Sequence, residues 1–228
     1  MSKIAFISDL HANIFALKAF LVEIAGAVDK IFCCGDILGY YPYQDETIEL
    51  LENNGIVSVM GNHDKYAVGL LSPQKPNKML IKSIEYSHRQ LSRKTREYIK
   101  GLPDSLEISI SETMINLSHG FFEDCEARVT KENLDSFLQG VETAAKALEY
   151  NFFGHTHIPF LRKIMDKTYI NVGSLGYPRQ TRPSYAVLDL SKNVVEICYF
   201  NYSTEKMRID IENRDYEPDY KRMLMRVL

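Results

Sequence analysis

The sequence predicts an α/β fold in which two β-sheets pack within one domain. Short apolar runs rich in β-branched residues alternate with helical patterns through about the first 155 residues. After that point the sequence becomes strand-rich, which indicates a second sheet. The 228-residue chain contains no internal repeat and no Gly/Ser linker, so we expect a single domain over residues 1–228. Its core should span about residues 3–200, followed by a charged C-terminal segment at about 205–228.

The opening residues predict one βαβ unit. Residues 4–7 form a continuous apolar run, which is typical of a strand covered on both faces. Apolar residues then recur at helical spacing over residues 14–24, with Asn13 as the N-cap and Gly26 as the stop signal. A second apolar run at residues 31–34 completes the unit.

The same criteria predict the remaining elements. Further strands are expected at residues 56–60, 114–117, 152–153, 169–172, 185–188 and 194–200, with a hairpin turn at Lys192-Asn193 before the last. Further helices are expected at residues 44–52, 82–100 and 132–150, the last broken near Gly140. The charge-dense segment at 205–228 should form a terminal helix that lies on the surface or against a partner, and a second copy of the chain is one candidate partner.

Composition and charge exclude several classes of function. The formal charge of −3 provides no basic field, which argues against long nucleic acid as a partner. No apolar stretch approaches the length of a membrane helix, so we expect no membrane association. The four cysteines form no C-x-x-C pair, and Cys33 and Cys34 fit the interior of a strand. We therefore expect a cytoplasmic protein in a reducing compartment.

Residue types that bind metal ions follow the predicted strands. Ligands are expected at the carboxyl ends of strands in α/β sheets, and flanking glycines allow close backbone approach. Each motif alone is weak, but together they predict a metal site. The motifs are Asp9-x-His11, Gly35-Asp36, Gly61-Asn62-His63-Asp64, His119-Gly120 and Gly154-His155-Thr156-His157.

In order and type, these five motifs resemble the signature of the calcineurin-like metallophosphoesterase superfamily over roughly residues 3–190. The stretches Gly39-Tyr40 and Asn171-Val172-Gly173-Ser174 resemble its small bacterial and archaeal predicted phosphodiesterases. The resemblance implies a four-layer α/β/β/α sandwich with two mixed β-sheets. It further implies that one metal ion is bound by Asp9, His11 and His157, that a second is bound by Asn62, His119 and His155, and that Asp36 bridges the two.

The ligand types indicate both the metals and the substrate. Imidazole, carboxylate and amide donors without thiolate suit Mn, Fe, Zn, Ni or Co better than Ca or Mg. Two divalent ions outweigh the charge of two carboxylates, so the centre should attract a phosphate ester. We expect a metal-bridging hydroxide to attack phosphorus in line. The resemblance suggests that His63 stabilises the transition state or protonates the leaving oxygen, with Asp64 orienting it; the alternative is that His63 only caps a turn.

The sequence therefore predicts a phosphodiesterase that hydrolyses small phosphodiester or nucleotide substrates. The alternatives are a dinucleoside polyphosphate hydrolase, a phosphomonoesterase, and a metal-binding scaffold for protein interaction. The sequence departs from the Ser/Thr protein phosphatase pattern, because Asp36 is followed by Ile37-Leu38-Gly39 and the Asn-His pair by Asp64. This departure argues against protein phosphatase activity.

The substrate pocket is predicted less sharply. Arg179 and Arg182 could reach a distal phosphate through bidentate contacts, or could simply be solvated. The aromatic residues Tyr40, Tyr41 and Tyr43 could stack on a base, but packing is the favoured interpretation. Residues 65–77 could form a flap over the site or a surface loop.

Overall fold

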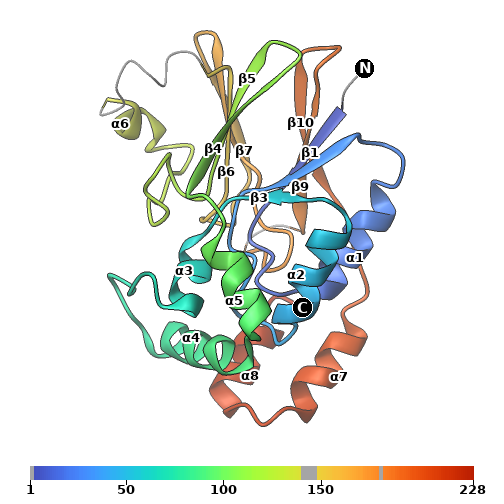
Figure 1. Ribbon diagram of the computed structural model, residues 1–228, viewed down its shortest axis with the longest axis vertical. Coiled ribbons are helices and arrows are strands. Elements are labelled where there is room, and N and C mark those ends of the chain that lie inside the picture. The colour runs from blue at the N-terminus through green and yellow to red at the C-terminus, as the bar shows by residue number, and fades with distance from the viewer. Residues whose placement is uncertain (1–2, 140–147, 180–181) are drawn as a thin grey trace.

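Two five-stranded mixed sheets face each other in the computed structural model, which describes residues 3–139, 148–179 and 182–228 (Figure 1). The first sheet has the order β10-β9-β1-β2-β3, formed by β1 (Lys3–Ile7), β2 (Lys30–Cys33), β3 (Val57–Ser58), β9 (Ser184–Asp189) and β10 (Val194–Tyr199). The second has the order β4-β5-β6-β8-β7, formed by β4 (Ser105–Ile110), β5 (Thr113–Ser118), β6 (Tyr150–Phe153), β7 (Phe160–Ile164) and β8 (Lys167–Asn171). Both sheets combine parallel and antiparallel pairs, as expected.

Helices cover the outer faces of both sheets. The first sheet packs against α1 (Ile14–Glu23), α2 (Gln44–Asn53) and α5 (Arg93–Lys100). The second packs against the short α6 (Leu134–Leu138) and the chain that precedes it. In Figure 1 the strands stand between α6 on one side and α1 with α2 on the other. This arrangement confirms the expected α/β/β/α layers.

The central strand of the first sheet, β1, is continuously apolar over residues 4–7 because both of its faces are covered. Successive side chains of a strand point to opposite faces. In β1, Ile4 and Phe6 enter the core between the sheets, whereas Ala5 and Ile7 pack toward the helices. The ring of Phe6 stacks on Phe152 of the second sheet, with centroids 3.5 Å apart and planes within 5°. Every position of this run is therefore buried.

The late strands do not all belong to the second sheet, which corrects one expectation. β9 pairs antiparallel with β1, and β10 pairs with β9, so both extend the first sheet. The second sheet instead begins with β4, which the sequence analysis missed together with β7. Apolar residues in β4 alternate with Glu107 and Ser109 because only one face of this edge strand is covered. An alternating edge strand lacks the apolar run that identified the central strands.

Two predicted helices also differ from the structure. The helix expected at 82–100 is two helices, α4 (Lys78–Gln90) and α5, because the Ser92 hydroxyl accepts a hydrogen bond from the Thr95 amide at 3.1 Å and begins a new helix. Within the helix expected at 132–150, the described residues hold α6, whereas Tyr150 already begins β6; residues 140–147 are not described. The break predicted at Gly140 lies outside the described residues.

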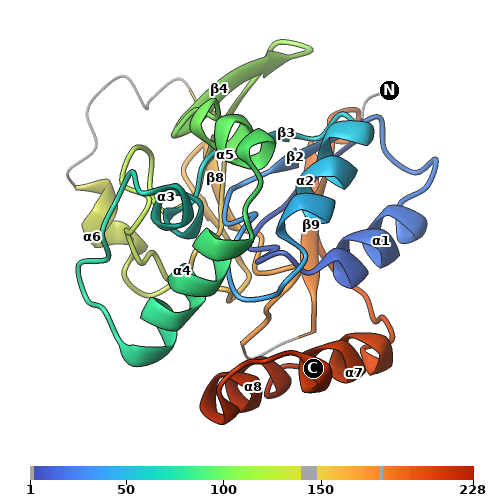
Figure 2. The same cartoon turned by 60° about the horizontal axis from the view of Figure 1, so that its bottom comes forward.

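The charged C-terminal segment forms two helices rather than one, α7 (Glu205–Asn213) and α8 (Pro218–Met225), which lie along one end of the sheets in Figure 2. Their apolar faces pack on the chain's own loop at residues 40–43. The Tyr220 hydroxyl donates to the Tyr40 carbonyl at 2.8 Å, and the Tyr41 hydroxyl donates to the Leu224 carbonyl at 3.3 Å. The segment therefore braces the loop that leaves β2.

Within the described ranges, none of the helices is both long and apolar enough to cross a membrane.

Candidate metal centre

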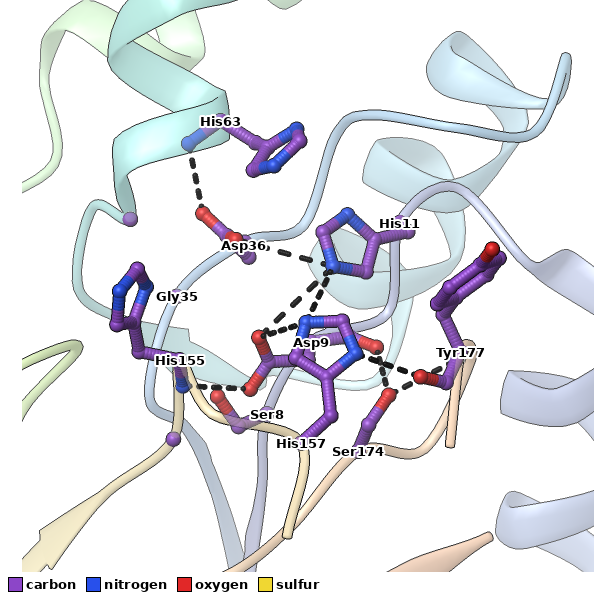
Figure 3. A network of polar contacts seen from close by, with 12 residues as sticks. Ser8, Asp9, His11, Gly35, Asp36, His63, His155, His157, Ser174 and Tyr177 are labelled. Atoms are coloured by element: carbon purple, nitrogen blue, oxygen red, sulfur yellow. Dashed lines mark hydrogen bonds and ion pairs between the residues drawn. The ribbon is translucent and has the colours of Figure 1, made fainter. Parts of the chain in front are cut away.

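The loops that leave five strands bring the predicted ligands together, and Figure 3 shows Asp9, His11, Asp36, His155 and His157 of this set. The first sheet supplies residues after β1, after β2 and at the start of α3 (Asn62–Val68), which follows β3. The second sheet supplies residues after β5 and β6. Six of the seven predicted ligands are buried and His155 is partly exposed; the set is Asp9, His11, Asp36, Asn62, His119, His155 and His157.

Four of these residues form one compact group. Asp9, His11, Asp36 and His157 each offer one ligand atom, and these atoms lie within 4.8 Å of one another. Nε2 of His157 is 3.1 Å from Asp9 Oδ1 and 3.1 Å from Nε2 of His11. Nε2 of His11 is 3.8 Å from Asp36 Oδ2. These distances leave room for one shared cation.

The remaining three residues form a second group, which His119 joins to Asp36. Nε2 of His119 is 3.2 Å from Asp36 Oδ2 and 3.0 Å from Asn62 Oδ1. Nδ1 of His155 is also 3.0 Å from Asn62 Oδ1. Asp36 Oδ2 therefore faces an imidazole nitrogen from each group, which is the placement that a bridging carboxylate requires.

The hydrogen bonds around the ligand group leave several of its acceptor atoms without a donor. Nδ1 of His157 contacts the Tyr177 carbonyl at 2.6 Å, and Nδ1 of His119 contacts the Cys34 carbonyl at 2.8 Å. Because a carbonyl only accepts, both Nδ1 atoms carry a proton, so each Nε2 is left to face the ligand group and presents a lone pair whenever its ring is neutral. The buried Asp9 Oδ1 accepts no hydrogen bond among the described residues. Converging lone pairs of this kind repel unless a cation binds them, so these residues fit a divalent metal.

The ionisation of the group favours a cation as well. Burial would raise the pKa of Asp9 and Asp36, but electrostatic interaction with neighbouring histidines, chiefly His157 and His119 respectively, holds both values below the usual range. Burial lowers the pKa of His155 to about 3, which keeps its ring neutral. Burial also opposes protonation of His119, yet the charge of Asp36 raises its pKa to about 9. A divalent ion beside Asp36 would displace that proton.

The backbone adopts an uncommon conformation at most ligand positions. Asp9, His11, Asp36, His155 and His157 all have φ between 48° and 65°, in the left-handed region. Hydrogen bonds between neighbouring loops hold this conformation: the His11 amide donates to the Asp36 carbonyl at 2.9 Å, and the Asp9 amide donates to the Gly35 carbonyl at 3.0 Å. The side chains are therefore aimed by a fixed backbone.

Two glycines permit the loops to approach each other, as the sequence predicted. A Cβ at Gly61 would overlap the backbone and carboxylate of Asp36. A Cβ at Gly154 would overlap Ser8 and the Asp9 carboxylate. No larger residue fits at either position without moving a ligand loop.

Asp64 joins two ligand loops, and this corrects the expectation that it orients His63. Its carboxylate accepts hydrogen bonds from the amides of Leu38 at 2.8 Å, Ile37 at 3.2 Å and Gly61 at 2.8 Å. The hydrogen bonds of Asp64 within the described chain thus go to the loops that carry Asp36 and Asn62. Asp64 acts as a positioning residue for the ligands.

A cavity of about 510 Å³ opens beside the ligands. His63 lines it, and burial lowers the pKa of this residue, while the charge of Asp36 opposes that shift. The His63 amide donates to Asp36 Oδ1 at 2.8 Å, so its backbone is fixed while its ring borders the cavity. Part of the 65–77 segment also lines the cavity, including Pro73 and Lys75.

Only some of the residues predicted for the substrate pocket line this cavity. Tyr40 and Arg179 line it, whereas Arg182 lies over the ring of Tyr199 at 5.6 Å from the centroid. Tyr41 and Tyr43 pack in the core beneath α7 and α8, as favoured. The exposed His88 and the thiols of the buried Cys33 and Cys34 lie outside the cavity wall and the ligand group, although the Cys34 carbonyl contacts His119.

The sequence analysis missed Lys75, Arg128, Tyr66 and Glu126, which also line the cavity. None of them belongs to a recognisable motif, and the segment at 65–77 was singled out only as a whole. A larger cavity of about 770 Å³ lies between β3 and β4 and is lined chiefly by apolar side chains. It contains none of the predicted ligands, so we place the chemistry at the smaller cavity.

Residues 2–193 match the family model of the calcineurin-like phosphoesterase superfamily domain. An uncharacterized protein of Methanocaldococcus jannaschii is 31% identical over 223 residues, covering 90% of each chain. A hypothetical protein of Pyrococcus horikoshii has a similar structure, with a TM-score of 0.86, 20% identity and 98% of each chain covered. The structure of a metallophosphoesterase from Sphaerobacter thermophilus gives a TM-score of 0.79 at 24% identity, covering 100% of this chain and 99% of that one.

Asp36→Asn should weaken binding of divalent metal by at least about tenfold, because it removes the anionic oxygen that faces both groups of acceptors. The measurement is the metal content per chain after equilibration with a buffered concentration of Mn²⁺. Asp166→Asn, which alters an exposed aspartate, is the matched control and should bind metal like the wild type. Wild-type affinity in Asp36→Asn would contradict the placement of Asp36 between the groups.

Asp64→Asn should lower the free energy of unfolding by about 1–3 kcal/mol, since an amide NH₂ would face at least one of the three backbone donors. Urea denaturation of the chelator-treated protein measures this change apart from metal binding. The variant should also bind metal more weakly than wild type. A stable variant with unaltered affinity would show that Asp64 does not hold the loops together.

Proposed function

The chain belongs to the calcineurin-like phosphoesterase superfamily, and on that premise we propose that it is a dinuclear metal-dependent phosphodiesterase acting on small phosphodiester or nucleotide substrates. The observation that carries the proposal is the position of Asp36 Oδ2, which lies 3.8 Å from Nε2 of His11 and 3.2 Å from Nε2 of His119. One carboxylate oxygen thus lies next to both groups of predicted ligands. Two adjacent divalent ions satisfy both groups.

The ligand geometry supports an assignment of each residue. One ion would be held by Asp9, His11 and His157, the other by Asn62, His119 and His155, with Asp36 shared. The donor set suits Mn, Fe, Zn, Ni or Co. Divalent ions held here supply Lewis acidity, which lowers the pKa of water and neutralises charge on a phosphoryl group.

The chain's own residues orient the ligands and border the reacting group. The Tyr177 and Cys34 carbonyls fix the rings of His157 and His119 through their Nδ1 protons. The side chain of His63 makes no hydrogen bond with another described residue and lies on the cavity wall with Asp36 and Asn62. From there its ring can donate a proton or a hydrogen bond to the leaving oxygen of a substrate.

Turnover of bis-p-nitrophenyl phosphate by the metal-loaded protein tests the proposal. We expect release of p-nitrophenol with at least one of Mn, Fe(II), Zn, Ni and Co, and loss of the activity on chelation. Faster turnover of p-nitrophenyl phosphate than of the diester would favour a phosphomonoesterase. No hydrolysis with any of these metals would favour a metal-binding scaffold and overturn the proposal.

His63→Ala should reduce kcat/KM for an alkyl phosphodiester by roughly 10²–10⁴-fold and spare a p-nitrophenyl diester more. The reason is that an alkoxide needs a proton to leave, whereas p-nitrophenolate does not. Steady-state kinetics on the two diesters measure the difference.

His88→Ala is the matched control, since His88 is exposed and lies outside the cavity. Its two rates should equal those of the wild type, and metal content should be unaltered in both variants. Equal losses on both diesters in His63→Ala would remove the assignment of His63 as an acid.

A further inference from the structure

We propose that the substrate carries at least one phosphate in addition to the one bound at the metal centre, and that Arg179, Arg128 and Lys75 bind this second phosphate. The corresponding substrate class is a nucleoside polyphosphate or an ester of one. This inference rests on the phosphoesterase function proposed above and specifies its substrate.

The first observation is the composition of the cavity wall. Arg179, Arg128 and Lys75 line the same cavity as the ligands Asp36, His155 and His157. A volume of about 510 Å³ lies in the range of sites for whole small-molecule ligands and exceeds what one phosphate fills. A substrate seated at the metal centre therefore extends along the cationic wall.

The second observation is that these three cations have no counterion among the described residues. In the ranges that the structure describes, none of the three side chains forms an ion pair or a hydrogen bond, although many other lysines and arginines do. The other carboxylate on the wall, Glu126, instead accepts hydrogen bonds from the Tyr66 hydroxyl and the Gln74 amide. The charge on the cationic wall is thus available to a ligand.

The third observation is that the cations come from three separate segments. Lys75 follows α3, Arg128 lies in the chain after β5, and Arg179 follows Tyr177, whose carbonyl fixes His157. Arg179 lines the same cavity as Tyr40, whose ring centroid is 4.4 Å from that of His11. In a chain with a net charge of −3, such a local concentration of positive charge attracts anionic substrates.

The chemistry of these groups matches phosphate rather than a neutral substrate group. Guanidinium groups bind phosphate oxygens through paired, charge-assisted hydrogen bonds, and an ammonium adds a point charge. A diester with a single phosphate would place its only anion at the metal centre and leave the three cations unmatched. A polyphosphate chain places one phosphate at the metal centre and another beside the three cations.

Two chromogenic substrates with the same base and the same leaving group test the inference. They are the p-nitrophenyl ester of thymidine 5′-monophosphate and the γ-p-nitrophenyl ester of thymidine 5′-triphosphate. The metal-loaded wild type should prefer the triphosphate ester in kcat/KM. Arg179→Ala and Arg128→Ala should each reduce this preference by about tenfold, mainly through KM for the triphosphate ester.

Arg93→Ala is the matched control, because Arg93 is an exposed arginine of α5 outside the cavity, and it should keep the wild-type preference. Equal losses on both esters in the cavity variants would overturn the second phosphate site and leave the phosphoesterase function standing. An unchanged preference would do the same. Hydrolysis of neither ester by the metal-loaded wild type would overturn the proposed function and the inference together.

Discussion

The mutual repulsion of buried lone pairs is the constraint around which this molecule is organised. Imidazole, carboxylate and amide groups from both sheets meet within hydrogen-bonding distance of one another, and most of them are buried. Five of these residues also hold a left-handed backbone, at a cost of roughly 1–2 kcal/mol each. Summed, this strain is comparable to the whole stability of a typical domain, so the surrounding structure has to impose it. The apolar core between the sheets and the hydrogen bonds between loops provide that support.

The strand-end motifs were predictable because they are local. A run of apolar residues followed by Gly-Asp or by Asp-x-His indicates both a strand and the metal ligand at its end. Because parallel strands end at a common edge of the sheet, such ligands are expected to lie close together. For the same reason Gly61 and Gly154 could be recognised as points of close approach, and the structure confirms both. The α/β/β/α layers followed from the family resemblance that these motifs carry.

The features that could not be predicted depend on distant contacts. β4 and β7 lie at the edges of the second sheet, where one exposed face removes the apolar run. Asp64 holds two ligand loops together through hydrogen bonds to residues as far as 27 positions away. Its place next to His63 in the sequence suggested instead that it orients that residue. Lys75 and Arg128 each stand alone in the sequence and become a group only in the folded cavity. Likewise, the charge of the C-terminal segment concealed the narrow apolar faces that pack α7 and α8 on the site loop.

The pairing of β1 with β9 has a consequence for synthesis on the ribosome. β1 is the middle strand of the first sheet, yet one of its two neighbours is formed by Ser184–Asp189. While the nascent chain is shorter than this, β1 has an open edge and part of its apolar face lacks cover. The sheet, and with it the loop that carries Asp9 and His11, is completed only after β9 has emerged from the exit tunnel. Folding of the amino-terminal half into its final sheet thus depends on a pairing between segments about 180 residues apart, and long-range pairings of this kind slow folding.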